Sequence, residues 1–268
     1  MRTALACVHA HPDDESLFTA GATARYADDG REVLLVTCTY GQLGFDARGR
    51  PGVFEDHDAA QTRATRAAEL AQASDLVGAT RCATLGYLDS GAPDWPSTSD
   101  PRAFANADPE KVARTLAALF DEVDAAVVLT YDENGFYGHP DHVMANRAAR
   151  IAVELSGSVE RLYYPVAPQR VLDEFIPAAR ARGVALPVFV TSAVGVPDSD
   201  VDCVIDASSV AARKQAAIAA HASQIDNADL VTMDADLFTL LFGTEYYRRA
   251  WSRSPAHGDE TDLFGGLT

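Results

Sequence analysis

The chain has 268 residues, of which 47% are hydrophobic, and its 22 Lys and Arg against 39 Asp and Glu give a formal charge of −17. A charge of this sign repels polyanions, so it disfavours nucleic acid and anionic membrane surfaces as partners. No apolar run reaches the roughly 20 residues of a membrane-spanning helix, and the N-terminus lacks the apolar stretch of a signal peptide. We therefore expect a soluble, cytoplasmic protein.

Short apolar runs alternate with segments of helical periodicity along the first 165 residues. The apolar runs predict strands at 5–9, 33–39, 81–85, 125–130 and 161–164. The segments between them predict helices at 16–29, 61–73, 109–123 and 142–155. Strands that are apolar throughout are typical of a sheet with both faces covered, and the alternation predicts an α/β protein with a doubly wound parallel sheet.

The pattern is less regular after about residue 165. It predicts short strands at 188–191 and 201–205 and an amphipathic helix at 208–223. Two long loops, 41–56 and 90–108, are rich in Gly, Pro, Asp and Ser and are expected to contact the substrate.

These elements predict a single domain over residues 1–253. It would comprise a core of residues 1–165 and a smaller C-terminal part, 166–253, on the substrate side. The polar and Gly-rich segment 254–268 is expected to be a flexible tail.

Two polar clusters directly follow two of the predicted strands. Residues 8–17 read V-H-A-H-P-D-D-E-S-L, and residues 131–142 read Y-D-E-N-G-F-Y-G-H-P-D-H. Ligands of a parallel α/β sheet bind at the carboxyl ends of its strands, so the fold brings both clusters to one edge. Either cluster alone also fits a helix N-terminus, where Pro and acidic residues are favoured. Their joint occurrence at strand ends favours a metal site.

A divalent metal ion would account for histidines and acids gathered at one point. His11 and Asp14 are three residues apart across a turn and can face one ion, while His142 can supply a third ligand. Two histidines and one carboxylate, with an open position for water, suit a catalytic Zn²⁺ site, and they also suit Fe²⁺.

The remaining polar residues of the clusters suggest acid–base chemistry. Asp13 could accept a proton from metal-bound water. His139 could donate a hydrogen bond or a proton to a developing oxyanion or leaving group. Asp141 is expected to orient His139 and raise its basicity.

The two clusters resemble the signature of a known enzyme family. A-H-P-D-D-E at 10–15 and G-H-P-D-H at 138–142 are similar to the paired motifs of the PIG-L/LmbE-type zinc de-N-acetylases. Within that family, the segments at 8–17, 36–39 and 130–135 most resemble the mycothiol-related N-acetylglucosaminyl-inositol deacetylase and mycothiol S-conjugate amidase. The resemblance implies a Rossmann-like, mostly parallel sheet with helices on both faces. It also implies zinc on His11, Asp14 and His142, with Asp13 as the general base.

The resemblance implies roles for three further residues. Tyr137 matches a tyrosine that approaches the oxyanion, and Arg66 and Asp89 match positions that hold the sugar. Arg66 could instead be a solvated arginine or a partner of Glu69, and Asp89 could be an ordinary turn residue.

Two features lie outside the paired motifs. The family often carries T-x-G-E-x-G after the second strand, whereas this chain has Gln42 in place of the acid. Lys214, His221 and Gln224 resemble a weaker family pattern on the late helix, most of which is expected to be core, so no role is assigned to them.

The leading hypothesis is a zinc-dependent hydrolase that removes an N-acetyl group from a small amino-sugar conjugate, such as an N-acetylglucosaminyl compound. One alternative is an amidase that acts on a mycothiol-type thiol conjugate. The other is a non-catalytic, metal-containing glycan-binding module. Asp13 and His139 argue against the binding module, because binding alone needs neither residue.

Overall fold

The computed structural model describes residues 4–186, 190–254 and 261–267. Within these residues the strand order is β3-β2-β1-β4-β5-β8-β7, and β6 pairs with β5. The first five strands are mutually parallel, whereas β8 runs antiparallel to both of its neighbours. The strands are β1 Ala4–His9, β2 Val33–Thr39, β3 Arg81–Tyr87, β4 Ala125–Leu129, β5 Arg161–Pro168, β6 Gly195–Val196, β7 Cys203–Asp206 and β8 Thr244–Ser252.

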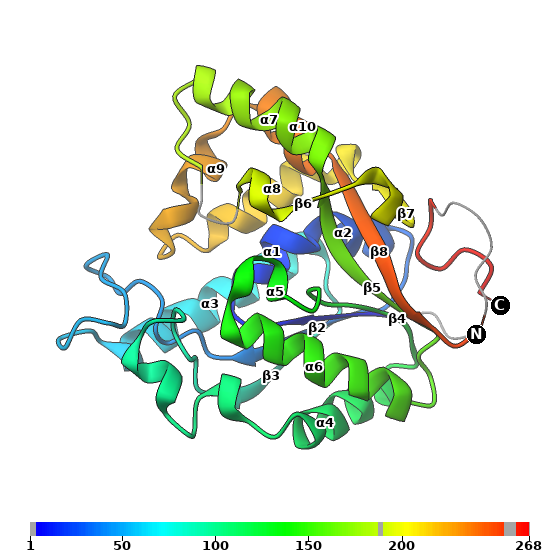
Figure 1. Ribbon diagram of the computed structural model, residues 1–268, viewed down its shortest axis with the longest axis horizontal. Helices are drawn as coiled ribbons and strands as arrows, with labels where there is room; N and C mark the ends of the chain where they lie inside the picture. The colour runs from blue at the N-terminus through cyan, green and yellow to red at the C-terminus, as the bar shows by residue number, and fades with distance from the viewer. Residues whose placement is uncertain (1–3, 187–189, 255–260, 268) are drawn as a thin grey trace.

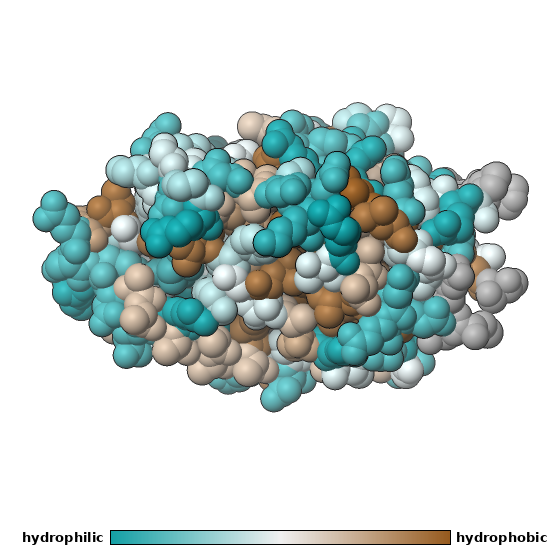
Figure 2. Space-filling view, turned by 90° about the horizontal axis from the view of Figure 1, so that it is seen from below, coloured by the Kyte–Doolittle hydropathy of each residue, from teal (hydrophilic) through white to brown (hydrophobic). Residues whose placement is uncertain are grey.

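Helices cover both faces of this sheet (Figure 1). The helices are α1 Asp14–Phe18, α2 Ala20–Asp28, α3 Ala59–Val77, α4 Pro109–Glu122, α5 Gly135–Gly138, α6 Pro140–Leu155, α7 Gln169–Ala181, α8 Ala211–Ala220, α9 Ala228–Thr232 and α10 Ala235–Phe242. In the described part of the chain, none of them combines the length and the apolar character that crossing a membrane requires. In Figure 2, hydrophilic side chains surround small separate apolar patches on one face of the molecule.

Alternate residues of β1 enter two different cores, as a sheet covered on both faces requires. Ala6 and Val8 pack in the core that includes α4 and α6, whereas Leu5 and Cys7 pack in the core that includes α2 and α3. All six residues of β1 are buried, which explains why the strand reads as a continuous apolar run.

The predicted strands of the first 165 residues are confirmed within a few residues of their ends. The predicted helix at 16–29 is divided into α1 and α2 at Thr19, whose φ of −135° is not helical. The predicted strand at 188–191 begins on residues outside the described part of the chain, and the short strand β6 lies further along.

The C-terminal third adds β7 and β8 to the same sheet, and β8 was not predicted. Its sequence, T-E-Y-Y-R-R-A-W-S, contains three charged residues and therefore lacks the continuous apolar character of the parallel strands. Burial alternates over its first four residues, because one face of an antiparallel strand near an edge can meet solvent.

Part of the segment expected to be a flexible tail is packed against the core, so that expectation is wrong for residues 261–267. Leu263 and Phe264 are buried, and the ring of Phe264 packs 5.0 Å from that of Tyr26. The Tyr26 hydroxyl donates to Asp262 at 2.8 Å and accepts from the backbone N–H of Leu263 at 2.7 Å. These apolar and polar contacts offset the entropy lost by ordering the segment.

The order of the strands places the loops that follow β1 and β4 side by side. The chain runs from β1 outward to β2 and β3, and then returns to form β4 on the other side of β1. The carboxyl ends of β1 and β4 therefore flank the point where the winding reverses, which is where open α/β sheets bind ligands.

Replacing Leu263 with Ala should lower the free energy of unfolding by about 2–4 kcal/mol, because a fully buried leucine leaves a cavity. The matched control is Leu155→Ala, since Leu155 is 54% exposed and should change stability by less than about 0.5 kcal/mol. Urea unfolding followed by circular dichroism measures both. Equal, small effects would show that the C-terminal segment is loosely attached.

Candidate active site

The turn after β1 is strained at Asp13, which has a φ of 118° and a ψ of −29°. A residue with a side chain adopts this region only where its surroundings enforce it, and such residues cluster at functional sites. Arg66 donates hydrogen bonds to the Pro12 carbonyl and, at 2.9 Å, to the Gly41 carbonyl. The same guanidinium lies 3.1 Å from the Asp13 carboxylate, so it fixes both the turn and the side chain.

The three predicted metal ligands converge, although the chain separates His11 from His142 by 130 residues. Asp14 Oδ2 lies 3.3 Å from His11 Nδ1 and 3.4 Å from His142 Nε2. All three side chains are buried. The Tyr131 hydroxyl donates to the same Asp14 oxygen at 2.6 Å and holds it in place.

The geometry around His142 fits a bound cation. Its Nδ1 lies 3.2 Å from the carbonyl oxygen of Gly135, which can only accept a hydrogen bond, so Nδ1 carries the proton. The lone pair is then on Nε2, which is buried, has no hydrogen-bond partner among the described residues and faces the Asp14 carboxylate. A buried lone pair that faces a carboxylate costs free energy unless a cation binds to both groups.

His11 has the same arrangement of one free and one anchored nitrogen. Its Nε2 lies 3.1 Å from Asp141 Oδ2 and 3.5 Å from Asp89 Oδ1, which leaves Nδ1 on the side of Asp14. Metal-binding histidines commonly donate their second N–H to a carboxylate in this way. His139 is also close, because ring nitrogens of His11, His139 and His142 lie within 4.8 Å of one another.

The expected side-chain pairing of Asp141 with His139 is wrong. The Asp141 carboxylate binds His11 and accepts hydrogen bonds from the backbone N–H, at 2.9 Å, and the hydroxyl of Ser90. The reason is its place on α6, because His139 is the N-cap of that helix and its Nδ1 accepts from the backbone N–H of Asp141 at 3.2 Å. The side chain of Asp141 is thereby free to reach His11 in the turn after β1.

The bond that caps α6 also fixes the tautomer of His139. A backbone N–H can only donate, so Nδ1 accepts and the proton of the neutral ring is on Nε2. Burial and the neighbouring His11 and His142 lower the pKa of His139 to about 2, which keeps the ring neutral. His139 is half-buried and lines the pocket, so this arrangement suits a hydrogen-bond donor.

The electrostatics of the cluster favour positive charge at its centre. Burial lowers the pKa of His11, but Asp89, Asp14 and Asp141 outweigh it and raise that pKa well above its ordinary value. Burial would raise the pKa of Asp14, yet the neighbouring histidines hold it well below its usual range. Burial raises the pKa of Asp13 to about 7 against the opposing effect of Arg66. A carboxyl that titrates near neutrality is suited to exchange a proton.

Four residues of the cluster, His11, Asp13, Asp14 and His139, line a pocket of about 290 Å³. Both long loops that were expected to contact the substrate contribute to its wall, with Leu43 and Phe45 from the first and Trp95 from the second. The remaining side chains of the wall are Leu17, Phe18, Pro51, Arg66, Asp89, Ala92, Tyr137, Gln224, Asp226 and Asn227.

The three residues expected to contact substrate or oxyanion all line this pocket, and their roles stay predictions. Arg66 is engaged with Asp13 and two carbonyl groups, as described above. Asp89 accepts backbone N–H groups of Gly91 at 2.8 Å and of Leu43 at 3.3 Å. Tyr137 is 39% exposed, with its ring centroid 5.1 Å from that of His142.

Sequence reasoning missed several residues that support the site. Tyr131, the first residue of the second cluster, holds Asp14, and Ser90, the residue after Asp89, holds Asp141. Glu15 ends the first motif, yet only the fold shows that it pairs with His221 at 2.7 Å. Gln42, which replaces the family acid, accepts a hydrogen bond from the backbone of Asp89 at 3.3 Å.

Comparison with known proteins agrees with this geometry. The family model described as PIG-L: GlcNAc-PI de-N-acetylase matches residues 6–153, which include both motifs. The chain belongs to the PIG-L family of de-N-acetylases. Membership of this family makes it a hydrolytic enzyme, and the family resemblance seen in the two motifs is confirmed.

Relatives and structural neighbours of this PIG-L family member extend over nearly the whole chain. A 1D-myo-inositol 2-acetamido-2-deoxy-α-D-glucopyranoside deacetylase from Geodermatophilus obscurus is 38% identical, over 98% of this chain and 97% of that protein. The N,N′-diacetylchitobiose deacetylase of Pyrococcus horikoshii superposes with a TM-score of 0.58 and 18% identity, over 92% of this chain and 83% of that one.

The shared fold alone does not specify deacetylation. The 4-carboxy-2-hydroxymuconate hydratase of Pseudomonas putida superposes with a TM-score of 0.61 and 18% identity, over 95% of this chain and 99% of that one. Identity at this level shows only a common fold, and one fold can support different reactions. The activity must therefore be argued from the residues of the site.

Replacing Asp141 with Asn should weaken metal binding by about 10–100-fold, because the carboxylate anchors His11. Competition with a chromogenic chelator for zinc measures the affinity. Asp226→Asn is the control, since Asp226 lines the same pocket and makes none of the contacts to His11 described above. An unchanged affinity for the Asp141 variant, with a lower turnover, would restore the expected partnership with His139.

Proposed function

We propose that the chain is a zinc-dependent deacetylase that removes the acetyl group from an N-acetylglucosaminyl conjugate. The observation that carries the proposal is the pair of anchored histidines directed at Asp14, next to a second carboxylate, Asp13, that faces the pocket. The deacetylase named for the Geodermatophilus relative, which spans almost the whole chain, supports an amino-sugar substrate.

His11, Asp14 and His142 would hold the metal ion. When bound, zinc polarises the amide carbonyl and lowers the pKa of a coordinated water molecule. The hydrogen bonds around the three residues keep the atoms that would bind the metal directed at one point. Little reorganisation of the side chains is therefore needed when the metal binds.

Asp13 is the proposed general base. Its carboxylate lines the pocket together with Asp14, and Arg66 restrains it through an ion pair at 3.1 Å. As water attacks the acetyl carbonyl carbon, Asp13 accepts the proton that the water loses. The proton then passes to the amide nitrogen as the C–N bond breaks, and the products are acetate and the free amino sugar.

His139 and Tyr137 are the proposed donors to the developing oxyanion. The Nε2–H of His139 is directed by the bond that its Nδ1 accepts from the start of α6. Tyr137 lies at the rim, and the tight turn before it has a strained φ of 63° at Phe136. Donors fixed before the reaction stabilise new negative charge without a reorganisation cost.

The rest of the pocket supports a sugar bound at its base with an aglycone toward the rim. Asp89 and Arg66 lie beside the ligand cluster and are proposed to contact sugar hydroxyl groups. Leu43, Phe45 and Trp95 form a more apolar part of the wall, on the two long loops. The aglycone would be selected there.

Asp13→Asn should keep stoichiometric metal and lose at least about 100-fold in turnover, because it removes the base but not a ligand. Asn is the best replacement, since it tolerates positive φ better than other residues with a side chain. His142→Ala removes a proposed ligand, so its main effect should be the loss of bound metal. Acetate release from an N-acetylglucosaminyl-inositol substrate measures turnover, and elemental analysis measures the metal.

The wild-type reaction should stop with a chelator and return when zinc is added. If the wild type, reconstituted with zinc or with iron, releases no acetate from a panel of N-acetylglucosamine conjugates, deacetylation is wrong. Chelator-sensitive binding of the same sugars without hydrolysis would then favour a glycan-binding module.

A further inference from the structure

The backbone of Asp13 is held by a buried carboxylate that does not belong to the pocket wall. Glu15 Oε2 accepts the backbone N–H of Asp13 at 2.9 Å, and Oε1 accepts the Ser16 hydroxyl at 2.6 Å. Glu15 is only 1% exposed and is not among the residues that line the pocket. Its carboxylate does not face a substrate in this pocket, and its direct contacts are with the residues that it orients.

A histidine from the C-terminal third holds Glu15 in turn. His221, at the C-terminal end of α8, places Nε2 2.7 Å from Glu15 Oε1, and the ring is 1% exposed. The two residues are 206 positions apart in the chain. Opposite charges attract strongly in such a buried pair, and the histidine fixes which Glu15 oxygen faces Asp13.

We propose that the His221–Glu15 pair is a positioning device that holds the Asp13 carboxylate in its orientation for proton transfer. The proposal rests on the role of Asp13 as general base. The turn has an unfavourable φ at Asp13, so it needs restraints on both sides. Arg66 supplies one through the Pro12 carbonyl and the Asp13 carboxylate, and Glu15 supplies the other through the Asp13 N–H.

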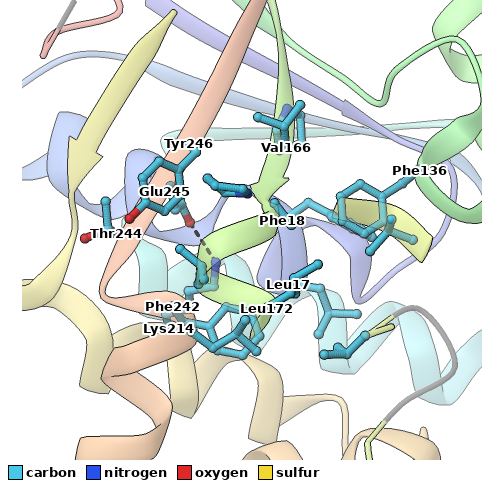
Figure 3. Close-up of a pocket in the computed structure, with 17 residues that line it drawn as sticks. Leu17, Phe18, Phe136, Val166, Leu172, Lys214, Phe242, Thr244, Glu245 and Tyr246 are labelled. Atoms are coloured by element: carbon cyan, nitrogen blue, oxygen red, sulfur yellow. Dashed lines mark hydrogen bonds and ion pairs between the residues drawn. The ribbon is translucent and has the colours of Figure 1, made fainter. Parts of the chain in front are cut away.

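The same helix offers a matched control at a second buried ion pair. Lys214 Nζ lies 2.7 Å from Glu245 Oε1, and both side chains are buried. Glu245 also accepts the backbone N–H groups of Gly21 and Ala22, both at 2.8 Å, and so holds the start of α2. Figure 3 shows this pair beside an apolar pocket lined by Leu17, Leu172 and Phe242. Among the described residues, this pair has no hydrogen bond or ion pair with Asp13, so it tests the loss of a buried charge pair alone.

Two substitutions at His221 separate the effect of its hydrogen bond to Glu15 from the effect of removing the imidazole ring. The amide nitrogen of Gln can reach the place of Nε2 and donate to Glu15, whereas the shorter side chain of Asn cannot. His221→Asn should lower kcat by about 100-fold, with KM within about threefold and full zinc content, because a small misplacement of a catalytic group has an effect of this size. His221→Gln should recover most of kcat.

Lys214→Met should lower the melting temperature at least as much as His221→Asn and keep kcat within about twofold of the wild type. The zinc-loaded enzymes are compared by melting temperature, zinc content and acetate release. Equal losses of kcat in the Lys214 and His221→Asn variants would show a general effect of destabilisation. A His221→Asn enzyme with wild-type kcat would also overturn the proposal.

A double substitution tests whether His221 acts through Asp13. In Asp13→Asn the base is absent, so adding His221→Asn should lower turnover by less than about threefold further, because residues that act as a unit are not additive. A full additional loss would show an independent effect and overturn the positioning role.

The two proposals fail in different ways. If the wild type releases acetate and Asp13→Asn retains the rate, the base assignment is wrong and the positioning role falls with it. If Asp13→Asn is inactive while His221→Asn is fully active, the proposed function stands and only the positioning role is wrong.

Discussion

The convergence of His11 and His142 on the carboxylate of Asp14 is the interaction on which the site depends. It exists because β1 and β4 are parallel neighbours at the point where the sheet reverses its winding, so both loops open at one edge. Each histidine keeps one nitrogen anchored, by Asp141 or by the Gly135 carbonyl, and directs the other inward. Because each ring has one anchored nitrogen and one nitrogen directed inward, the loops after the two strands form a site for a divalent cation.

The strained turn at Asp13 gives two adjacent carboxylates different surroundings. Asp14 faces two histidines and a tyrosine hydroxyl, which favour its ionised form, whereas Asp13 faces Arg66 and the pocket. An extended or helical backbone at this position would change the direction of one of them. The cost of the positive φ is therefore linked to the separation of the proposed ligand, Asp14, from the proposed base, Asp13, and backbone strain of this kind is common at active sites.

The C-terminal third is bound to the catalytic region by charge as well as by the sheet. At the end of α8, His221 pairs with Glu15 of α1. Lys214 of α8 pairs with Glu245 of β8, which accepts the backbone N–H groups of Gly21 and Ala22 in α2. All four charged side chains are buried. Buried charges are costly unless they are paired, so these contacts fix how α8 meets α1 and α2. A part of the chain distant from the proposed metal ligands in sequence can in this way determine the geometry of the turn that carries Asp13.

The sequence by itself determined the parallel strands and predicted the metal ligands, because both are local signals. Buried strands read as continuous apolar runs, and His11, Asp14 and His142 stand directly after two of them. Only the tertiary structure decided that Asp141 anchors His11, that the last strand joins the sheet and that His221 reaches Glu15. Those contacts depend on side-chain direction and on segments distant in the chain, and charged residues hide β8 from a search for apolar runs. Local patterns record burial and turn chemistry, but not which distant residue completes a hydrogen bond.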